Sequence, residues 1–306
     1  MTVASATIAP TAAPLVTPRV NRRNDWAYGL MLFPAVALFT VFIALPAAVG
    51  IAFSFTNYAG FGSWKWIGLA NYRSLLHDST ILGSYKFTIG FAVVTTIVVN
   101  AIALALAIGL NSKIHLKKTL RSVFFMPMVL SGIVVAYVFQ YIFSSAIPDI
   151  ATSIGWAGGE QSLLASQHWA WLGVVIVTAW QAIPGAMIIY LAGLLSISPQ
   201  VYEAASMDGA RAWRTFRSIT LPLVAGYVII NSILSLKSFL NAYDVIVGLT
   251  NGGPGTSTTS VAMAIFNGLN TGDYAYSMAN AVIFFIVTVV ISLVQLRFIK
   301  GREVSL

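Results

Sequence analysis

Residues 203–209 read Glu203-Ala204-Ala205-Ser206-Met207-Asp208-Gly209, a short polar stretch between two long apolar runs. Ser198 precedes Pro199 in the arrangement of an N-cap residue followed by a proline at the first helical position, which predicts a helix that continues to Met207. Gly209 is predicted to end this helix, because glycine readily adopts the left-handed backbone that follows a helix C-terminus. Three arginines and Ile219-Thr220-Leu221-Pro222 follow. The pattern predicts a short helix outside a membrane, a bend, and a basic helical entry into the bilayer.

Composition places the rest of the chain in a membrane. Of its 306 residues, 58% are hydrophobic and 8% are charged, whereas about a quarter of the residues in soluble domains are charged. Six apolar runs are long enough, at about 20 residues, to cross a bilayer as helices. They cover residues 27–53, 87–110, 122–143, 169–195, 221–248 and 274–296. The sequence therefore predicts an all-α, polytopic membrane protein with six transmembrane helices, and with the 203–209 helix between the fourth and the fifth.

The segments outside these runs predict the domain boundary and the orientation. Residues 1–24 are rich in Thr, Ala and Pro and predict a disordered tail, so one transmembrane domain is expected over residues 25–306. With six spans, four segments lie on one side of the membrane: the tail, the loop after the second run, the loop with the 203–209 helix, and the C-terminus. These segments contain most of the 17 Lys and Arg residues, whereas the other side of the membrane has only Lys65, Arg73 and Lys86. The positive-inside rule then predicts that both termini and the 203–209 helix are cytoplasmic. Two prolines in the first run, Pro34 and Pro46, are expected to kink that helix or end it early.

The spacing of residues around the 203–209 helix resembles a known loop signature. The sequence has Glu203-Ala204-Ala205, then Gly209 after three residues, Ile219 after nine more, and Leu221-Pro222 after one more. This spacing is similar to the signature of the binding-protein-dependent ABC importer permeases. In that family the loop lies between the fourth and fifth of six spans and contains the coupling helix, which docks into a cleft of the cytoplasmic ATPase subunit. The resemblance implies that the residues which couple to the ATPase are Glu203, Ala204, Ala205, Asp208 and Gly209.

Two further segments resemble the carbohydrate-uptake branch of the same family. Residues 66–72, Trp-Ile-Gly-Leu-Ala-Asn-Tyr, are similar to the GLxNY segment after the first span of permeases for sugars and glycerol phosphates. Asp244 with residues 249–254, Leu-Thr-Asn-Gly-Gly-Pro, is similar to the segment after their fifth span. The resemblance implies a permease for a sugar or polyol in the bacterial cytoplasmic membrane. The implied partners are a second, non-identical permease, two ATPase subunits, an extracytoplasmic solute-binding protein and the lipid bilayer, with no nucleic acid.

Catalytic motifs are missing from the sequence. The chain has no G-x-x-x-x-G-K-[ST] phosphate loop and no Gly-Lys pair. Its three histidines do not have metal-ligand spacing, and it has no cysteine. No catalytic residue, metal or cofactor is therefore expected in this chain, and ATP and Mg are expected to be bound by the partner ATPase subunits.

Polar residues in the fifth run are candidates for a substrate path. Lys237 falls near its middle, where a charge costs at least ~2.5 kcal/mol, and the spacing of Lys237, Asn241 and Asp244 places them on one face of a continuous helix. A second polar strip consists of Asn231, Ser235 and Ser238. Two interpretations stay open: the lysine pairs with a polar group of the partner permease, or these side chains line a water-filled path for polar solutes. The polar residues of the other runs, which either bond to neighbouring helices or line the same path, are Asn100, Gln140, Gln181 and Asn280.

Two other classes of membrane protein are alternatives to a permease of this family. An ion-coupled secondary transporter would carry charged relays in several spans, whereas only the fifth run contains a charge. A membrane-embedded enzyme would need convergent His, Asp or Glu side chains at membrane depth. Co-purification of an ATPase subunit distinguishes these three classes.

Overall fold

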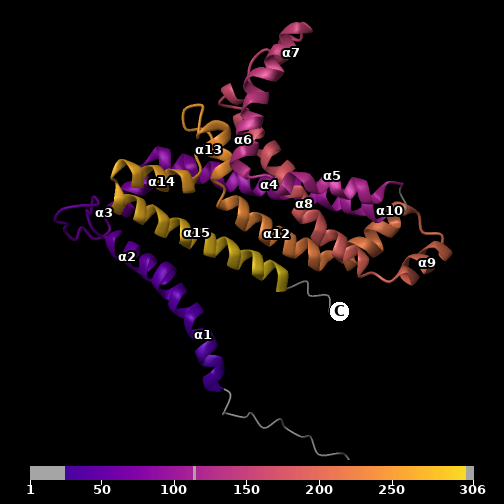
Figure 1. Cartoon of the computed structure of the whole chain (residues 1–306), viewed down its shortest axis with the longest axis horizontal. Helices are drawn as coiled ribbons and strands as arrows, with labels where there is room; N and C mark the ends of the chain where they lie inside the picture. The colour runs from indigo at the N-terminus through magenta and orange to yellow at the C-terminus, as the bar shows by residue number, and fades with distance from the viewer. Residues whose placement is uncertain (1–24, 113–114, 301–306) are drawn as a thin grey trace, which may run out of the picture. The chain divides into compact units, whose positions relative to one another are not determined.

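The computed structural model describes residues 25–112 and 115–300, and within them every regular element is helical (Figure 1). An isolated bridge between Thr56 and Trp66 is the only β-type pairing in this part of the chain. The prediction of an all-α fold is confirmed. The tail predicted to be disordered, residues 1–24, lies outside the described residues. The chain divides into two compact units, Met1–Val49 and Gly50–Leu306.

The described part of the first unit is a long apolar helix. It comprises α1 (Asp25–Phe39), the π-helical turn η2 (Thr40–Ala44) and the beginning of α2 (Leu45–Phe53). Residues Tyr28–Phe53 are long and apolar enough to cross a membrane, in agreement with the first predicted run. The helix passes Pro34 and Pro46 without ending, so the expectation of an early end is wrong.

Three of the prolines that lie within helical segments are preceded by a π-helical turn. Each turn ends two residues before a proline: η2 before Pro46, η3 (Ile142–Ala146) before Pro148, and η6 (Phe216–Thr220) before Pro222. In each case the residue just before the proline donates its N–H to the carbonyl five residues earlier. A proline has no N–H, and its ring clashes with the carbonyl four residues before it. The wider π turn keeps the neighbouring backbone groups hydrogen-bonded, as a membrane helix requires.

Four long helices form the centre of the second unit. They are α4 (Ser79–Asn111), α8 (Ala170–Leu195), α12 (Ala225–Leu240) and α15 (Tyr274–Lys300). α4 lies against α8 and α12, and α12 also contacts α8 and α15 (Figure 1). The fully buried residues of α4 include three alanines, Ala92, Ala103 and Ala107. Small residues at these positions let the backbones approach closely, which is how helices associate in membranes.

The third span is displaced from its predicted position. The apolar run 122–143 is broken at Leu130 and Ser131, whose backbones are extended. α5 (Lys117–Val129) is therefore separate from the candidate span Gly132–Ser153, which joins α6 (Gly132–Tyr141), η3 and α7 (Ile147–Ser153). The tertiary structure stabilises the break, because Gln181 of α8 donates from Nε2 to the Leu130 carbonyl oxygen at 2.9 Å.

The fifth span is interrupted at both ends of α12. Before α12, residues Ala212–Leu223 meet Ala225–Leu240 at a bend of 66°. The first of these segments comprises α10 (Ala212–Thr215), η6 and α11 (Leu221–Leu223). After α12, the chain breaks at residues 241–243, and α13 (Asp244–Thr250) starts a new helix. With the bent pair counted as one span, the described residues contain six candidate membrane spans, as predicted, but the prediction of a continuous helix over 221–248 is wrong.

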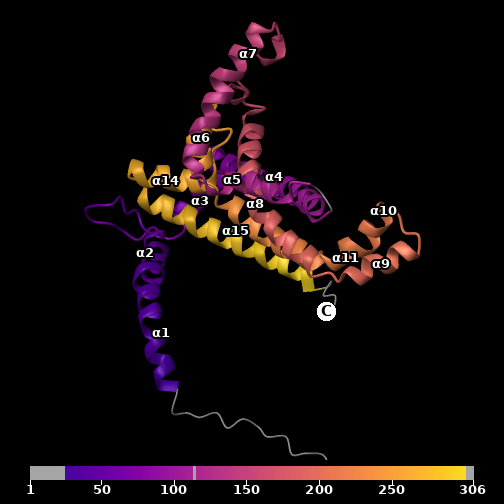
Figure 2. The ribbon, with the colours of Figure 1, turned by 45° about the vertical axis from the view of Figure 1, so that its right-hand side comes forward.

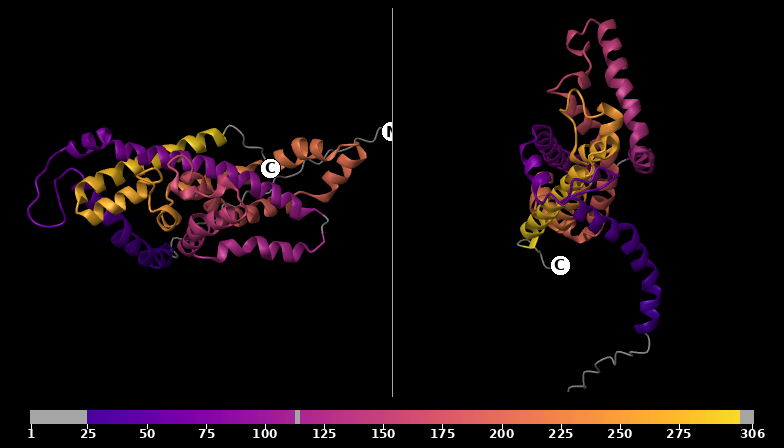
Figure 3. Two further views of the ribbon diagram at one scale, coloured as in Figure 1. Left: turned by 90° about the horizontal axis from the view of Figure 1, so that it is seen from above. Right: turned by 90° about the vertical axis from the view of Figure 1, so that its left-hand side faces the viewer.

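Shorter elements connect the spans of the second unit. They are α3 (Ala70–His77), η4 (Ala157–Gly159), η5 (Leu163–Ala165), α9 (Pro199–Met207) and α14 (Val261–Thr271). α14 lies along α15, and α3 contacts α4 and α15. α9 and α10 lie at one end of this unit and α3 and α14 lie at the other, as Figure 2 shows and the view from above in Figure 3 confirms.

Candidate functional site: a surface helix and a polar hollow

α9 begins and ends where the sequence predicts. Its N-cap residue is Ser198 and a proline follows, although the Ser198 hydroxyl bonds to the Gln200 side chain and caps no backbone N–H. At the other end Gly209 has a φ of +70°. The Gly209 N–H donates to the Ser206 carbonyl oxygen at 3.1 Å, and the Ala210 N–H donates to the Ala205 carbonyl oxygen at 3.0 Å. These bonds form the Schellman motif, so the predicted bend at Gly209 is confirmed.

One face of α9 is buried and the other is exposed. Ala205 is 6% exposed, and the Tyr202 hydroxyl lies 3.3 Å from the Thr220 hydroxyl of η6. This face therefore fixes α9 against the beginning of the fifth span. The other residues predicted to couple to an ATPase are exposed, namely Glu203, Ala204, Asp208 and Gly209.

Apolar side chains are also exposed in and after α9. Met207 is 88% exposed. Trp213, whose ring lies 5.5 Å from that of Phe216 between centroids, is 69% exposed. Arg211 and Arg214 are exposed in the same segment. Exposed apolar side chains among charged ones are typical of a surface that binds another protein.

A polar hollow lies where the fifth span is broken. Its volume is about 360 Å³, and it lies between α6, α8, the end of α12 and the start of α13. Three of the predicted path residues line it, Ser238, Asn241 and Asp244, together with Gln181 and Thr178 of α8. The structure thus brings three residues predicted for a substrate path together with two polar residues of α8.

Thr178 is the residue of this hollow that sequence analysis missed. Its hydroxyl oxygen is buried and finds no hydrogen-bond partner among residues 25–112 and 115–300. Thr178 and Gln181 are three residues apart, and this spacing places both on one face of α8. This spacing is the feature of the sequence that could have identified Thr178. Threonine is common in apolar runs, however, so its presence there did not indicate a site.

Two of the predicted path residues are buried away from the hollow. Asn231 is 2% exposed and donates from Nδ2 to the Ala186 carbonyl oxygen of α8 at 2.9 Å. Ser235 lies 3.5 Å from Asn100 Nδ2 of α4, and the Asn100 Oδ1 accepts a hydrogen bond from the Tyr190 hydroxyl at 2.6 Å. These side chains join α4, α8 and α12, a role that interhelical hydrogen bonds commonly have in membranes.

Lys237 does not lie in the middle of a continuous helix. It occupies the last turn of α12, and its side chain is exposed. At this position the helix dipole stabilises a cation. Asn241 donates from Nδ2 to the Lys237 carbonyl oxygen at 2.9 Å, but Asp244 starts α13 beyond the break. The prediction that Lys237, Asn241 and Asp244 share one helix face is therefore wrong, because the helix ends before Asp244.

The motif at residues 66–72 fastens the chain after α2. Asn71 donates from Nδ2 to the carbonyl oxygens of Ser54 and Thr56, both at 2.9 Å. Tyr72 adds a hydrogen bond of 2.6 Å between its hydroxyl and that of Ser54. One amide side chain thus satisfies two backbone carbonyls in the turn after α2, which explains why an Asn-Tyr pair occurs at this position.

We expect Asn71→Ala to lower the stability of the permease by about 1–3 kcal/mol, because it leaves partly buried carbonyl groups without partners. The measurement is the melting temperature of the purified protein in detergent. Asn267→Ala is the control, because Asn267 is exposed on α14. Equal melting temperatures for the two variants would contradict the fastening role.

Comparison with known proteins identifies the family. Residues 100–302 match the family described as binding-protein-dependent transport system inner membrane component. The chain belongs to this family. It is therefore a multi-pass permease of the inner membrane, and neither an ion-coupled secondary transporter nor a membrane-embedded enzyme.

Individual relatives agree with this assignment, and a solved structure shares the fold. The permease is 34% identical to the multiple sugar-binding transport system permease protein MsmF of Streptococcus mutans, over 94% of this chain and 100% of the relative. It is 32% identical to the probable starch degradation products transport system permease protein AmyD of Thermoanaerobacterium thermosulfurigenes, over 93% and 97% of the two chains. The fold matches a chain of a bacterial alginate ABC transporter, in complex with an alginate-bound periplasmic protein, with a TM-score of 0.80, 22% identity and coverage of 91% and 96%.

Proposed function

We propose that this permease forms half of the translocation path of an ATP-driven importer for a sugar or related polyol. The observation that carries the proposal is its similarity, over nearly the whole chain, to permeases named for starch degradation products and for multiple sugars. The segments at residues 66–72 and 249–254 support the same substrate class. The proposed partners are a second, non-identical permease, two ATPase subunits and an extracytoplasmic solute-binding protein.

ATP hydrolysis is assigned to separate subunits in this proposal. The sequence contains no phosphate loop, so ATP and Mg belong to the ATPase subunits. α9 and the two residues after it couple the permease to them, because Glu203, Ala204, Asp208 and Gly209 are exposed there beside the exposed Met207. The Lys and Arg distribution supports a cytoplasmic location for α9 and both termini, where ATP is available.

The polar hollow is the proposed place where this subunit contacts substrate. Sugars present many hydroxyl groups, and a site that binds them needs hydrogen-bond donors and acceptors that converge. Gln181, Ser238, Asn241 and Asp244 supply amide, hydroxyl and carboxylate groups around a space of about 360 Å³. The non-helical residues 241–243 between α12 and α13 line this space, and membrane proteins tolerate non-helical backbone where it lines a cavity.

The test of the whole proposal is ATP-dependent sugar uptake by the reconstituted complex. The permease, its partner subunits and the solute-binding protein are reconstituted in vesicles, and uptake of labelled oligosaccharides is measured with and without ATP. We expect uptake that needs both ATP and the binding protein. Uptake that an ion gradient drives in the absence of ATP would contradict the proposal.

Cysteine labelling tests the substrate path, because the chain has no cysteine of its own. Cysteines at Ser238 and Asn241 should react with a small polar thiol reagent, and bound sugar should slow the reaction several-fold by covering the hollow. The control is Ile230→Cys, which is exposed on α12 but lies outside the hollow. Equal labelling rates at all three positions, with no effect of sugar, would contradict the proposal that the substrate path passes through the polar hollow. The proposal that the complex transports sugar would not be affected.

A further inference from the structure

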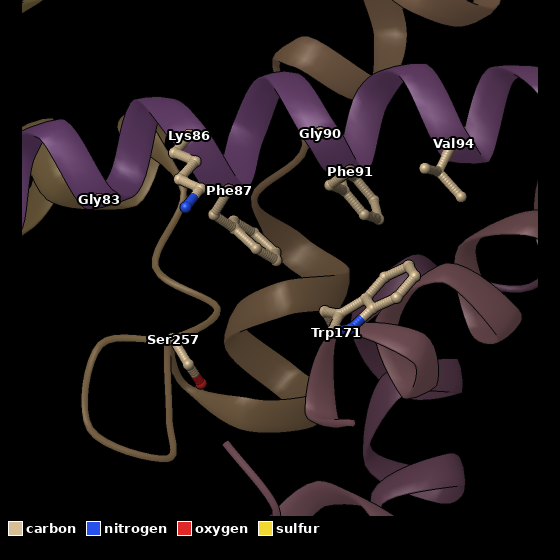
Figure 4. Close-up of a pocket in the computed structure, with 8 residues that line it drawn as sticks. All are labelled: Gly83, Lys86, Phe87, Gly90, Phe91, Val94, Trp171 and Ser257. Carbon is tan, nitrogen blue, oxygen red and sulfur yellow. The ribbon is translucent and has the colours of Figure 1, made fainter. Parts of the chain in front are cut away.

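A second hollow lies beside α4, away from the polar hollow. Its volume is about 400 Å³, which is within the range of about 300–1,000 Å³ found for small-ligand sites. Phe87, Phe91 and Val94 project from the side of α4 that faces Trp171 at the beginning of α8, and Lys86 lies farther from Trp171, near Gly83 (Figure 4). Ser257, which lies on a loop, also lines this space. Apolar walls with one cation therefore surround this space.

Glycines of α4 keep the hollow open. Gly83 and Gly90 line it, and a Cβ added to either would meet nothing within 4 Å. Phe87 and Phe91 are stacked, with centroids 5.6 Å apart and an angle of 14° between their planes. The rings thus form a flat wall along one turn of α4, and the missing side chains of the glycines leave a groove beside them.

One polar group in the hollow has no partner. The Ser257 hydroxyl oxygen is buried and finds no hydrogen-bond partner in the described part of the chain. A buried hydroxyl without a partner is unfavourable, so a ligand with a hydrogen-bond acceptor would stabilise it. Lys86, exposed at the same end of the groove, supplies a positive charge for that acceptor.

The length of α4 places this end of the groove at the membrane surface. α4 has 33 residues and is about 50 Å long at 1.5 Å per residue, whereas the hydrocarbon core is about 30 Å thick. If α4 is centred in the bilayer, about 10 Å extends beyond the core at each end. Lys86 is eight residues into the helix, so it lies near the headgroups, and residues 87–94 descend into the hydrocarbon. Trp171, at the beginning of α8, suits the same interface.

We propose that this groove binds an anionic phospholipid, with its phosphate at Lys86 and Ser257 and an acyl chain along Phe87, Gly90, Phe91 and Val94. The charge of Lys86 favours an anionic headgroup over a zwitterionic one. The small volume of the hollow favours a lipid chain over a helix of a partner subunit, since a helix with its side chains is about 10 Å wide. With the termini in the cytoplasm, as proposed above, the lipid belongs to the outer leaflet. This proposal does not depend on the sugar specificity.

Quenching of Trp171 fluorescence tests the proposal. The purified complex is placed in bilayers that contain phosphatidylglycerol or phosphatidylcholine with brominated acyl chains, and the Trp171 signal is isolated by comparison with Trp171→Phe. We expect stronger quenching by the brominated phosphatidylglycerol. Lys86→Gln should reduce the preference for phosphatidylglycerol about fivefold, and Gly90→Leu should abolish quenching by filling the groove.

Matched controls separate the groove from general membrane effects. Lys65→Gln removes another exposed lysine, and Gly109→Leu makes the same change at an open glycine near the other end of α4; neither should alter the quenching. Equal quenching by the two lipids, or an unchanged preference in Lys86→Gln, would overturn the proposal. No quenching of Trp171 by either lipid would also overturn it, because protein would then cover the groove.

Discussion

Replacing Glu203 by lysine is expected to abolish uptake by the reconstituted complex while the permease stays folded. The Glu203 side chain is exposed on α9, so the substitution removes no buried contact. If α9 docks into a basic cleft of the ATPase subunit, the lysine places like charges against each other. Loss of a close charge pair at an interface costs about 2–5 kcal/mol, which is a decrease of at least about 30-fold in affinity. Substrate-stimulated ATP hydrolysis should fall together with uptake.

Two further variants make this result specific to α9. Glu203→Gln removes the charge without reversing it, and uptake should be intermediate. Glu160→Lys reverses an exposed carboxylate in the loop after η4, and uptake should stay normal. The measurements are uptake, ATP hydrolysis and the amount of ATPase subunit that co-purifies. A Glu203→Lys complex that assembles and transports normally would contradict the coupling role.

Features that depend on local sequence were predicted correctly. A proline after a serine and a glycine ten residues later are sufficient to begin and end α9, and the Gly209 backbone adopts the predicted conformation. The spans were predictable because hydrocarbon demands long apolar helices whatever the neighbours are. Each of these features depends on residues that lie close together in the chain.

Features that depend on contacts between distant residues were not predicted. The break before α6 looks apolar in the sequence, and it is stabilised by an amide of α8, Gln181, about 50 residues later. The run 221–248 looks continuous because residues 241–243 include no proline or glycine. Its polar residues consequently divide in the structure, with Asn231 and Ser235 between helices and Ser238 at the hollow. Periodicity alone cannot show where a helix ends when tertiary contacts decide it.

Gly248→Leu is expected to disrupt the polar hollow and abolish uptake. Gly248 is buried where α13 packs against α6 (Figure 1). A Cβ at this position would lie 2.7 Å from the Ala136 Cβ and 3.3 Å from the Ile133 carbonyl oxygen. Both atoms belong to a helix and cannot rotate away, so α13 must move. Overpacking of this kind costs about 1–3 kcal/mol or more, and it displaces Asp244 at the start of α13 from the hollow.

A compensating change shows whether the contact between α13 and α6 causes the loss. Gly248→Ala should reduce uptake less than Gly248→Leu, because it adds one methyl group. Ala136→Gly removes the atom nearest to that methyl group, so the double variant Ala136→Gly/Gly248→Ala should recover most of the uptake. Gly226→Leu is the control, since a Cβ at Gly226 of α12 meets nothing within 4 Å. If Gly248→Leu transports normally, or if Ala136→Gly restores nothing to Gly248→Ala, then the position of α13 does not determine the geometry of the substrate path.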